Sequence, residues 1–401
     1  MAELLDKKKK NKIYFISLLE GMLLGLPFTI FGILIPVMSD DLMISASYMG
    51  VILSINAFSS FIAVFVAGNL IELFGIKKVI VLSNIFLIIG MAMISFAREN
   101  ILLTVSYFIT GFGSGGLAIT LNSLVSSTSA SKNQRSKRLL YLGVVMFVGA
   151  ISGALITRAV LLLEKNWRFC FSGVGALFII MLIAIIRLDL SEYKVKASYT
   201  VKNFFRMYKG VLLNPHLIIM GIIVFLHNGA IVIFVNWFTT YFKGFNIPVE
   251  VSALFLILFT VSEIAGLLLK IFLLKFLKES RIIIINAVFA IVCFMGLLFF
   301  DNVIIKILFI AGIGISVTGV FMLVTSMGLD INKKNSGIVL GYIYASAHIG
   351  SVVLLYISGL LIDRFSHLSI LYTCLAGWLL LLIFAVMNSI FEKKAVNKLL
   401  V

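Results

Sequence analysis

Four ionisable side chains stand inside long apolar stretches of this sequence: Glu20, His227, Glu263 and His348. A charge in the hydrocarbon core of a bilayer costs at least about 2.5 to 3.5 kcal/mol, so such residues persist mainly where they face protein or a watery cavity. Carboxyl and imidazole groups in such places can bind and release protons or hydrogen-bond to a solute. We therefore expect proton-coupling or substrate-binding roles among these four residues.

Each of these residues also has a purely structural interpretation. Glu20 could be a solvated glutamate in a vestibule or could pair with a neighbouring helix, and Ser262 and Gly266 around Glu263 could mark a helix contact. An intramembrane histidine can simply hydrogen-bond to a neighbouring helix. Both interpretations remain open on the sequence alone.

An aromatic pattern follows His227 in the stretch FLHNGAIVIFVNWFTTYF. His227, Phe234 and Tyr241 recur every seven residues, so they share a helix face, and Trp237 precedes Tyr241 by one turn. Rings with polar tips suit the edges of a sugar or an organic acid, which makes Trp237 and Tyr241 candidate substrate contacts. The alternative is an aromatic belt that anchors the helix at the membrane interface.

The elements that must position these residues are membrane helices. Hydrophobic residues make up 61% of the 401-residue chain and charged residues only 12%, and a membrane span needs about 20 mostly apolar residues. The sequence predicts twelve spans, at about 13–38, 46–71, 77–97, 101–127, 138–163, 168–188, 216–242, 248–272, 281–300, 303–328, 336–362 and 367–390. We expect an all-α polytopic membrane protein.

The net charge of +16 is a topology signal. Most of the 33 Lys and Arg residues fall on the side that holds both termini, which the positive-inside rule assigns to the cytoplasm. The same charge suits anionic lipid headgroups and is no evidence for nucleic-acid binding. All three cysteines lie inside apolar stretches, so we expect no disulfide and no metal site.

The chain is internally repeated. ISGALITR at 151–158 and ISGLLIDR at 357–364 agree at six of eight positions, and they end the fifth and eleventh predicted spans. Weaker pairs in the same order match the fourth span to the tenth and the sixth to the twelfth. We expect two six-helix bundles related by a pseudo-twofold axis along the membrane normal, one repeat pattern of secondary transporters. The expected parts are the N-terminal bundle 1–188, a cytoplasmic linker 189–215, the C-terminal bundle 216–392 and a cytoplasmic tail 393–401.

The stretch GNLIELFGIKK between the second and third spans resembles the signature loop of the major facilitator superfamily. Glu72 and Leu73 replace the Asp and Arg that are usual there, and NWRF at 166–169 is also similar to the family pattern. The resemblance implies that spans 1, 4, 7 and 10 line a central cavity and that this loop helps to gate it, with Glu72 near the start of the eleventh span. The gating residues implied on the loop are Gly68, Glu72, Gly75, Lys77 and Lys78.

The repeated sequence suggests an outer gate, because its two copies end in Arg158 and Arg364. The resemblance to the family implies that Arg158 lies near Glu250 and that Arg364 lies near Asp40 or Asp41. Interfacial snorkelling and a local contact with Asp363 are the alternatives for Arg364.

These observations favour a secondary transporter in the cytoplasmic membrane that works by alternating access. We expect proton-coupled uptake of an organic anion or sugar, with efflux of an amphipathic compound by proton antiport as the alternative. The sequence contains no Gly-rich phosphate loop of the ATP-binding type and little that could serve an enzyme, so we expect no catalytic residues and no cofactor. The expected partners are a small-molecule substrate, protons and membrane lipids, and the expected state is a monomer.

Overall fold

The computed structural model describes residues 2–129, 132–190, 214–331 and 336–399, and within these ranges all regular structure is helical. In a bilayer every backbone N–H and C=O must find its partner inside the protein, which an α-helix achieves within a single segment. The predicted linker 189–215 falls almost entirely outside the described ranges, and the last helix continues through the predicted tail as far as Leu399.

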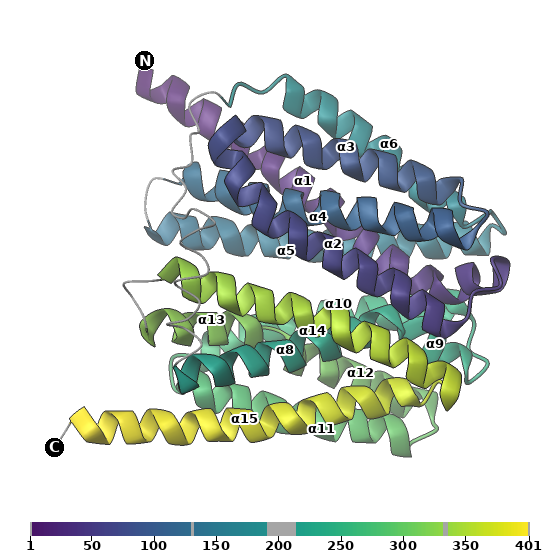
Figure 1. Cartoon of the computed structure of the whole chain (residues 1–401), viewed down its shortest axis with the longest axis vertical. Helices are drawn as coiled ribbons and strands as arrows, with labels where there is room; N and C mark the ends of the chain where they lie inside the picture. Colours follow the sequence, from purple (N-terminus) through teal and green to yellow (C-terminus); the bar gives the residue numbers. More distant parts are fainter. Residues whose placement is uncertain (1, 130–131, 191–213, 332–335, 400–401) are drawn as a thin grey trace. The chain divides into compact units, whose positions relative to one another are not determined.

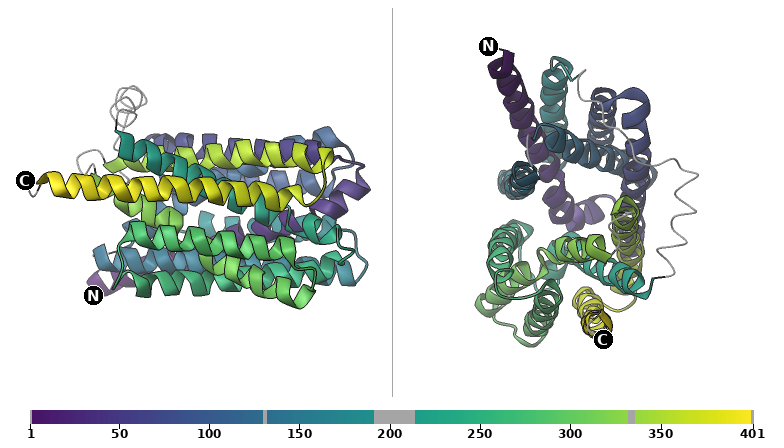
Figure 2. Two further views of the ribbon diagram at one scale, coloured as in Figure 1. Left: turned by 90° about the horizontal axis from the view of Figure 1, so that it is seen from below. Right: turned by 90° about the vertical axis from the view of Figure 1, so that its left-hand side faces the viewer.

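The chain forms two compact units, Met1–Ala197 with Asn246–Leu254, and Ser198–Phe245 with Phe255–Val401. Within each unit the long helices run side by side (Figures 1 and 2). The helices of the N-terminal half are α1 (Ala2–Asp41), α2 (Ala46–Phe74), α3 (Ile76–Ser95), α4 (Asn100–Ser127), α5 (Lys132–Leu162) and α6 (Arg168–Ile186).

The second half begins after the linker and contains shorter pieces among its helices. Its helices are α8 (Pro215–Asn236), α9 (Phe238–Lys243), α10 (Val249–Leu273), α11 (Glu279–Phe299), α12 (Val303–Val317), α13 (Val320–Ile331), α14 (Ser336–Arg364) and α15 (Ser369–Leu399). Twelve stretches of the described helices are long and apolar enough to cross a membrane, at the predicted places. The predicted all-α, twelve-helix membrane fold is confirmed.

Two of the predicted spans are broken. The tenth span, Val303–Ile331, is interrupted between α12 and α13, where Thr318 is extended and Gly319 has φ of 82°. The seventh stretch is interrupted at Trp237, whose φ and ψ of −92° and 9° end α8 before α9 begins. The backbone hydrogen bonds continue from Trp237 N to Ile233 O and from Tyr241 N to Trp237 O, both at 2.9 Å. Phe234 packs on Phe294 and Tyr241 donates to Leu297 O, both on α11, and the common face with His227 stays a prediction.

Both halves bring one pair of helices very close together through glycine. A Cβ on Gly25 of α1 would collide with the carbonyl of Met146 in α5, and a Cβ on Gly350 of α14 would collide with that of Phe225 in α8. Polar groups reinforce the first contact, where Thr29 Oγ1 donates to Ala150 O at 2.6 Å. Span 1 thus packs on span 5 as span 7 packs on span 11, which agrees with an internal duplication.

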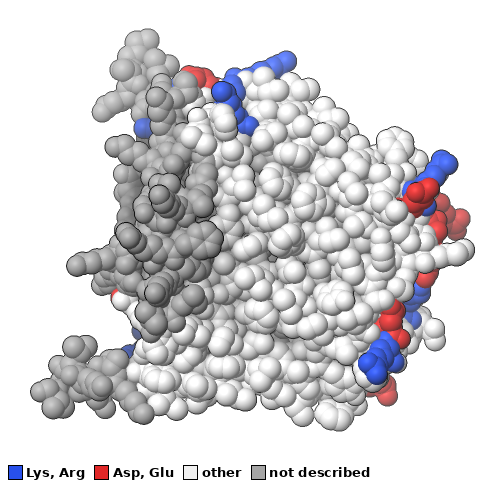
Figure 3. All heavy atoms as spheres, viewed as in Figure 1, with Lys and Arg blue, Asp and Glu red and all other residues white. Residues whose placement is uncertain are grey.

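The side chains fit a lipid environment. On the face shown in Figure 3, the charged side chains of the described residues gather at the helix ends and leave the middle of the helices uncharged. Large apolar side chains stay exposed along the middle of outward helices, for example Val292 of α11 and Ile383 of α15. Exposure of this kind is favourable only where lipid covers the helices.

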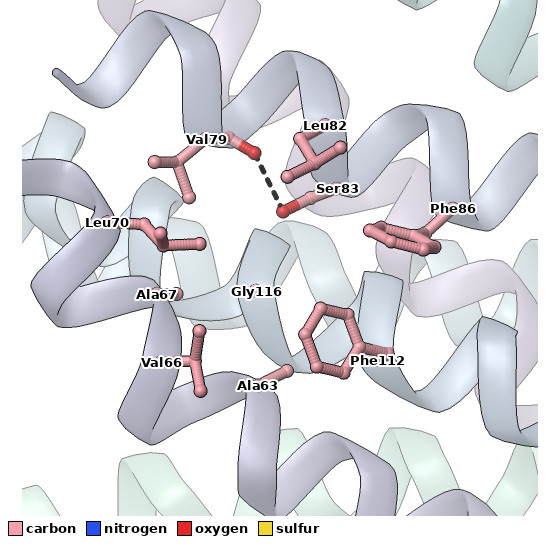
Figure 4. Close-up of a pocket in the computed structure, with 10 residues that line it drawn as sticks. All are labelled: Ala63, Val66, Ala67, Leu70, Val79, Leu82, Ser83, Phe86, Phe112 and Gly116. Atoms are coloured by element: carbon pink, nitrogen blue, oxygen red, sulfur yellow. Dashed lines mark hydrogen bonds between the residues drawn. The ribbon is translucent and has the colours of Figure 1, made fainter. Parts of the chain in front are cut away.

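A small cavity lies among α2, α3 and α4 in the first unit (Figure 4). Its volume is about 10 Å³ and its lining is almost wholly apolar. Ser83 lines it, but its hydroxyl donates to Val79 O at 2.9 Å. A space of that size holds about one water molecule, so this cavity is a packing gap and not a solute site.

Candidate functional site

The break between α12 and α13 leaves backbone carbonyls without helical partners. The last four C=O groups of any α-helix lack an intrahelical donor, and those of α12 end in the middle of a membrane span. Buried carbonyls need donors from elsewhere, since an unsatisfied polar group in an apolar environment is costly. Two side chains of the same unit supply them.

The first donor is Lys270 of α10, which is only 3% exposed. Its Nζ donates to Ile315 O at 2.5 Å and to Ser316 O at 3.3 Å. The negative end of the α12 dipole lies at these carbonyls and favours a cation there. Gly319 is required beside it for two reasons: its φ of 82° is accessible mainly to glycine, and a Cβ would lie 2.9 Å from Lys270 Cδ.

The second donor is His227 of α8, which is 3% exposed. Its Nε2 lies 2.7 Å from Val317 O. A carbonyl can only accept, so Nε2 carries the proton, and Nδ1 has no hydrogen-bond partner among the described residues. The ring packs edge-to-face on Trp378 at 5.6 Å, and the indole Nε1 of Trp378 also lacks a partner in the described structure.

Glu263 completes the group and precedes Lys270 by seven residues on α10, so both lie on one face of that helix. Its side chain is 7% exposed and attracts the Lys270 ammonium. The backbones of α10 and α12 are close there, because a Cβ on Gly314 would lie 3.3 Å from Glu263 N. Glu263, Lys270, His227 and the carbonyls of residues 315–317 are called the helix-break cluster below.

The other predicted carboxylate, Glu20, lies in the first unit and is fully buried. Its Oε1 accepts a hydrogen bond from Asn84 Nδ2 of α3 at 2.7 Å. No salt bridge to Glu20 is formed within the described ranges. The structure therefore brings Glu263 and His227 together in one cluster and places Glu20 in a separate one.

The predicted aromatic contacts are used for internal packing. Trp237 Nε1 donates to Ser358 Oγ at 2.9 Å, and Tyr241 OH donates to Leu297 O at 3.1 Å. Both aromatic residues are at most 1% exposed. Their role in substrate binding remains a prediction.

Tyr241 belongs to a second cation site in this unit. Lys306 of α12 donates from Nζ to Tyr241 OH at 2.9 Å and lies 3.9 Å from the centre of the Phe245 ring. His367 packs edge-to-face on the same Phe245 ring at 5.2 Å. The remaining predicted histidine, His348, is partly buried on α14, the helix that packs against α8.

The signature loop has a structural role within the first unit. Gly75, at φ of 82°, ends α2 and starts α3 without an intervening loop. Lys77 Nζ donates to Ile186 O at 2.8 Å and to Leu188 O at 2.6 Å, so it caps the C-terminal end of α6. Lys78 lies 6.0 Å from the Phe74 ring.

The predicted gating positions Gly68 and Glu72 lie on α2, before Gly75. Gly68 has open space beside it among the described atoms. The side chain of Glu72 and the side chains at the start of α14 lie outside the described part of the chain. The gating role of this loop stays a prediction.

The predicted outer pairing of Arg364 with Asp40 or Asp41 remains a prediction. Asp41, expected near Arg364, accepts from Arg168 Nη1 at 2.8 Å and from Trp167 Nε1 at 3.2 Å. Arg168 also donates to Ala97 O at 2.6 Å, so it joins three chain segments of the first unit.

The two repeated arginines differ in their surroundings. The guanidinium of Arg364 lies 5.9 Å from the neighbouring Phe365 ring. Arg158 Nε is buried and has no hydrogen-bond partner among the described residues. Its pairing with Glu250, at the start of α10, remains a prediction.

Sequence reasoning missed Lys270, Lys306 and Asn84. The two lysines stand near the ends of predicted spans, where a long cationic side chain usually reaches the interface. The spacing of seven residues between Glu263 and Lys270 was the available signal for one of them. Asn84 is a single amide in the middle of an apolar stretch, and its role becomes visible only through its hydrogen bond to Glu20.

Comparisons with known proteins agree with this architecture. The family model of the Major Facilitator Superfamily matches residues 18–353. A protein named TsgA homolog from Buchnera aphidicola subsp. Schizaphis graminum is 24% identical over 279 residues, which cover 68% of this chain and 69% of the relative. The TsgA homolog of Yersinia pestis (strain Pestoides F) is 18% identical over 88% of this chain and 89% of its own length.

Solved structures show the same fold at low identity. The nucleoside transporter NupG superposes with a TM-score of 0.76 at 14% identity, covering 96% of this chain and 99% of its own. A D-xylose-proton symporter superposes with a TM-score of 0.74 at 12% identity, covering 93% of this chain and 96% of its own. The family match spans most of the chain and rules out an enzyme in favour of a carrier: this multi-pass membrane protein belongs to the major facilitator superfamily of transporters.

Proposed function

We propose that this transporter takes up a small organic anion together with protons across the cytoplasmic membrane, with both termini in the cytoplasm. The observation that carries the proposal is the buried ammonium of Lys270, which binds the carbonyls of a helix break and attracts the buried Glu263 on the same helix face. Discontinuous membrane helices form the substrate and ion sites of several transporter folds.

Charge balance links the proton to the anion. Lys270 and Glu263 together are close to neutral, but a proton on Glu263 leaves the ammonium without its counter-charge. Leaving a buried ion unpaired costs several kcal/mol. A solute carboxylate near Lys270 restores neutrality, so proton and anion favour each other's binding.

Two further groups could orient such a solute. The indole N–H of Trp378 is a buried donor with no partner among the described residues, and His227 Nδ1 is a buried polar atom in the same situation. Orphaned polar atoms of this kind call for an explanation in a native structure, and a carboxylate with hydroxyl or amide groups could satisfy both.

The Lys270 ammonium favours an anion over a neutral sugar, because it attracts a negative charge and has no such attraction to a neutral solute. The solved D-xylose-proton symporter is named for proton coupling, which supports a proton as the coupling ion here. That likeness is one of fold, so the choice of substrate depends on the cluster itself.

The test is transport by the purified protein in proteoliposomes. A panel of labelled monocarboxylates and size-matched sugars is offered under an inside-alkaline pH gradient, with the membrane potential clamped at zero. We expect accumulation of a monocarboxylate, driven by the pH gradient alone. Lys270→Met should abolish this accumulation, whereas the exposed Lys275→Met, on the segment just after α10, should retain it.

Two results would contradict the proposal. One is accumulation of a sugar at equal rates in the wild type and in Lys270→Met. The other is gradient-driven extrusion of an amphipathic compound with no uptake of any anion, which would favour efflux by antiport. The orientation is checked separately, by the accessibility of terminal tags in right-side-out vesicles.

A further inference from the structure

Glu20 and Asn84 form an isolated polar pair between α1 and α3 in the first unit. Both side chains are fully buried. No charged side chain of the described residues pairs with Glu20: it forms no ion pair, and its interaction partner is the amide of Asn84. The guanidinium of Arg138 on α5 instead stacks on Tyr14, six residues earlier on α1 and thus about 9 Å away along the helix.

Two acceptor atoms of the Glu20–Asn84 pair lack a hydrogen-bond donor among the described residues. Asn84 Nδ2 uses both of its hydrogens, one to Glu20 Oε1 at 2.7 Å and one to Ile80 O at 2.9 Å. Asn84 Oδ1 and Glu20 Oε2 are both buried and have no partner within the described structure. The pair is therefore short of one donor, and both atoms that lack a partner are acceptors when Glu20 is ionised.

The orientation of the amide is fixed by its surroundings. The carbonyl of Ile80 can only accept a hydrogen bond, so the NH₂ group of Asn84 must face it. A flipped amide would put its oxygen against the Ile80 carbonyl and against a carboxylate oxygen. Rotation of Asn84 thus cannot supply the missing donor.

One proton supplies it. We propose that Glu20 is a neutral carboxylic acid in this conformation, with its Oε2–H donating to Asn84 Oδ1 while Asn84 Nδ2 donates to Oε1. The acid and the amide then make two antiparallel hydrogen bonds, and every polar atom of the pair is satisfied. Loss of the proton leaves a buried carboxylate with one neutral donor and no cation, a state that proteins avoid.

The pair is therefore a proton-binding site of the N-terminal half, separate from the helix-break cluster. The proton is released when movement of α1 against α3 lets water or a cation reach Glu20. This role in transport rests on the proposed proton-coupled function, whereas the protonation of Glu20 does not.

Infrared spectroscopy of the protein in liposomes tests the protonation directly. The C=O stretch of a carboxylic acid is separate from the carboxylate bands, and it shifts in heavy water. We expect the difference spectrum between the wild type and Glu20→Gln at neutral pH to contain this band. Carboxylate bands in their place would overturn the proposal.

Two variants keep the test independent of folding. The amide introduced by Glu20→Gln can accept from Asn84 Nδ2 and donate to Asn84 Oδ1, so this variant should unfold at the same temperature as the wild type. Asn84→Leu removes both hydrogen bonds, and its own difference from the wild type should show the acid band moved to the position of an unbonded acid. An unmoved band in Asn84→Leu would show that the two residues do not form the acid–amide pair.

The transport role has its own outcome. With the acid band present, Glu20→Gln should lose pH-gradient-driven accumulation and keep exchange of substrate down its gradient. Unchanged accumulation in this variant would overturn the role in coupling. Absence of any transport by the wild type would instead speak against the proposed function, and the infrared result would stand by itself.

Discussion

Lys270→Met is the substitution that most directly tests the helix-break cluster. Methionine keeps an unbranched stem of similar length, so the packing against Gly319 is preserved. The change removes only the ammonium, and with it the donors to Ile315 O and Ser316 O.

The expected loss of stability follows from what is left behind. Two buried carbonyls lose their donor at about 1 to 3 kcal/mol each, and Glu263 loses its counter-charge. Losing both donors costs about 2 to 6 kcal/mol, and the lost attraction between Lys270 and Glu263 adds to this cost. We expect a loss in this range, whereas the exposed Lys275→Met should cost less than about 0.5 kcal/mol.

The assay is a double-mutant cycle, with the free energy of unfolding followed by detergent titration in mixed micelles. Glu263→Gln removes the carboxylate that Lys270→Met leaves unpaired, so the double variant should be more stable than the sum of the single effects, by at least about 1 kcal/mol. Additivity within about 0.5 kcal/mol would show that Glu263 and Lys270 are not coupled, and a loss no larger than that of Lys275→Met would refute the role assigned to the ammonium.

Three other outcomes can be measured on the same preparation. Gly319→Ala should lower the unfolding free energy by about 1 to 2 kcal/mol, because its positive φ disfavours any Cβ, and thermal unfolding measures this. Burial and the neighbouring Lys306 ammonium lower the pKa of His367, so the unfolded state binds more protons than the folded state. The unfolding temperature should therefore fall as the pH drops below about 6.5, the ordinary pKa of histidine. His367→Gln should abolish this dependence on pH. For the predicted outer gate, Arg158→Glu should slow transport and expose outer-vestibule cysteines to labelling, and adding Glu250→Arg should restore both; a double reversal no better than the single would exclude the pair.

The spans could be predicted from sequence because their signal is local. About 20 apolar residues in a row identify a membrane helix without any knowledge of its neighbours, and the predicted span 46–71 matches the observed Ala46–Gly68 closely. The breaks could not be predicted in this way. Gly319 is one glycine among 31, and it ends a helix only because Lys270 and His227 are present to bind the released carbonyls.

The candidate site was predicted only in part, for a similar reason. Glu263 and His227 stand out because ionisable residues are rare in apolar stretches. Lys270 stands near the end of its span, where a long side chain usually reaches the headgroups, so its position in the sequence does not indicate a buried site. Its ammonium turns inward instead, because a half-helix C-terminus in the same unit offers carbonyls and a favourable dipole.

The two buried carboxylates show how far duplicated halves can diverge in chemistry. Glu20 accepts a hydrogen bond from a neutral amide, whereas Glu263 shares a helix face with Lys270, whose ammonium attracts its carboxylate. The same substitution should therefore act in opposite ways. Glu20→Gln reproduces the neutral pair and should leave stability unchanged, while Glu263→Gln leaves Lys270 buried without a counter-charge and should destabilise the fold. Equal effects of the two variants on the unfolding free energy would mean that the partners of these carboxylates do not determine their protonation.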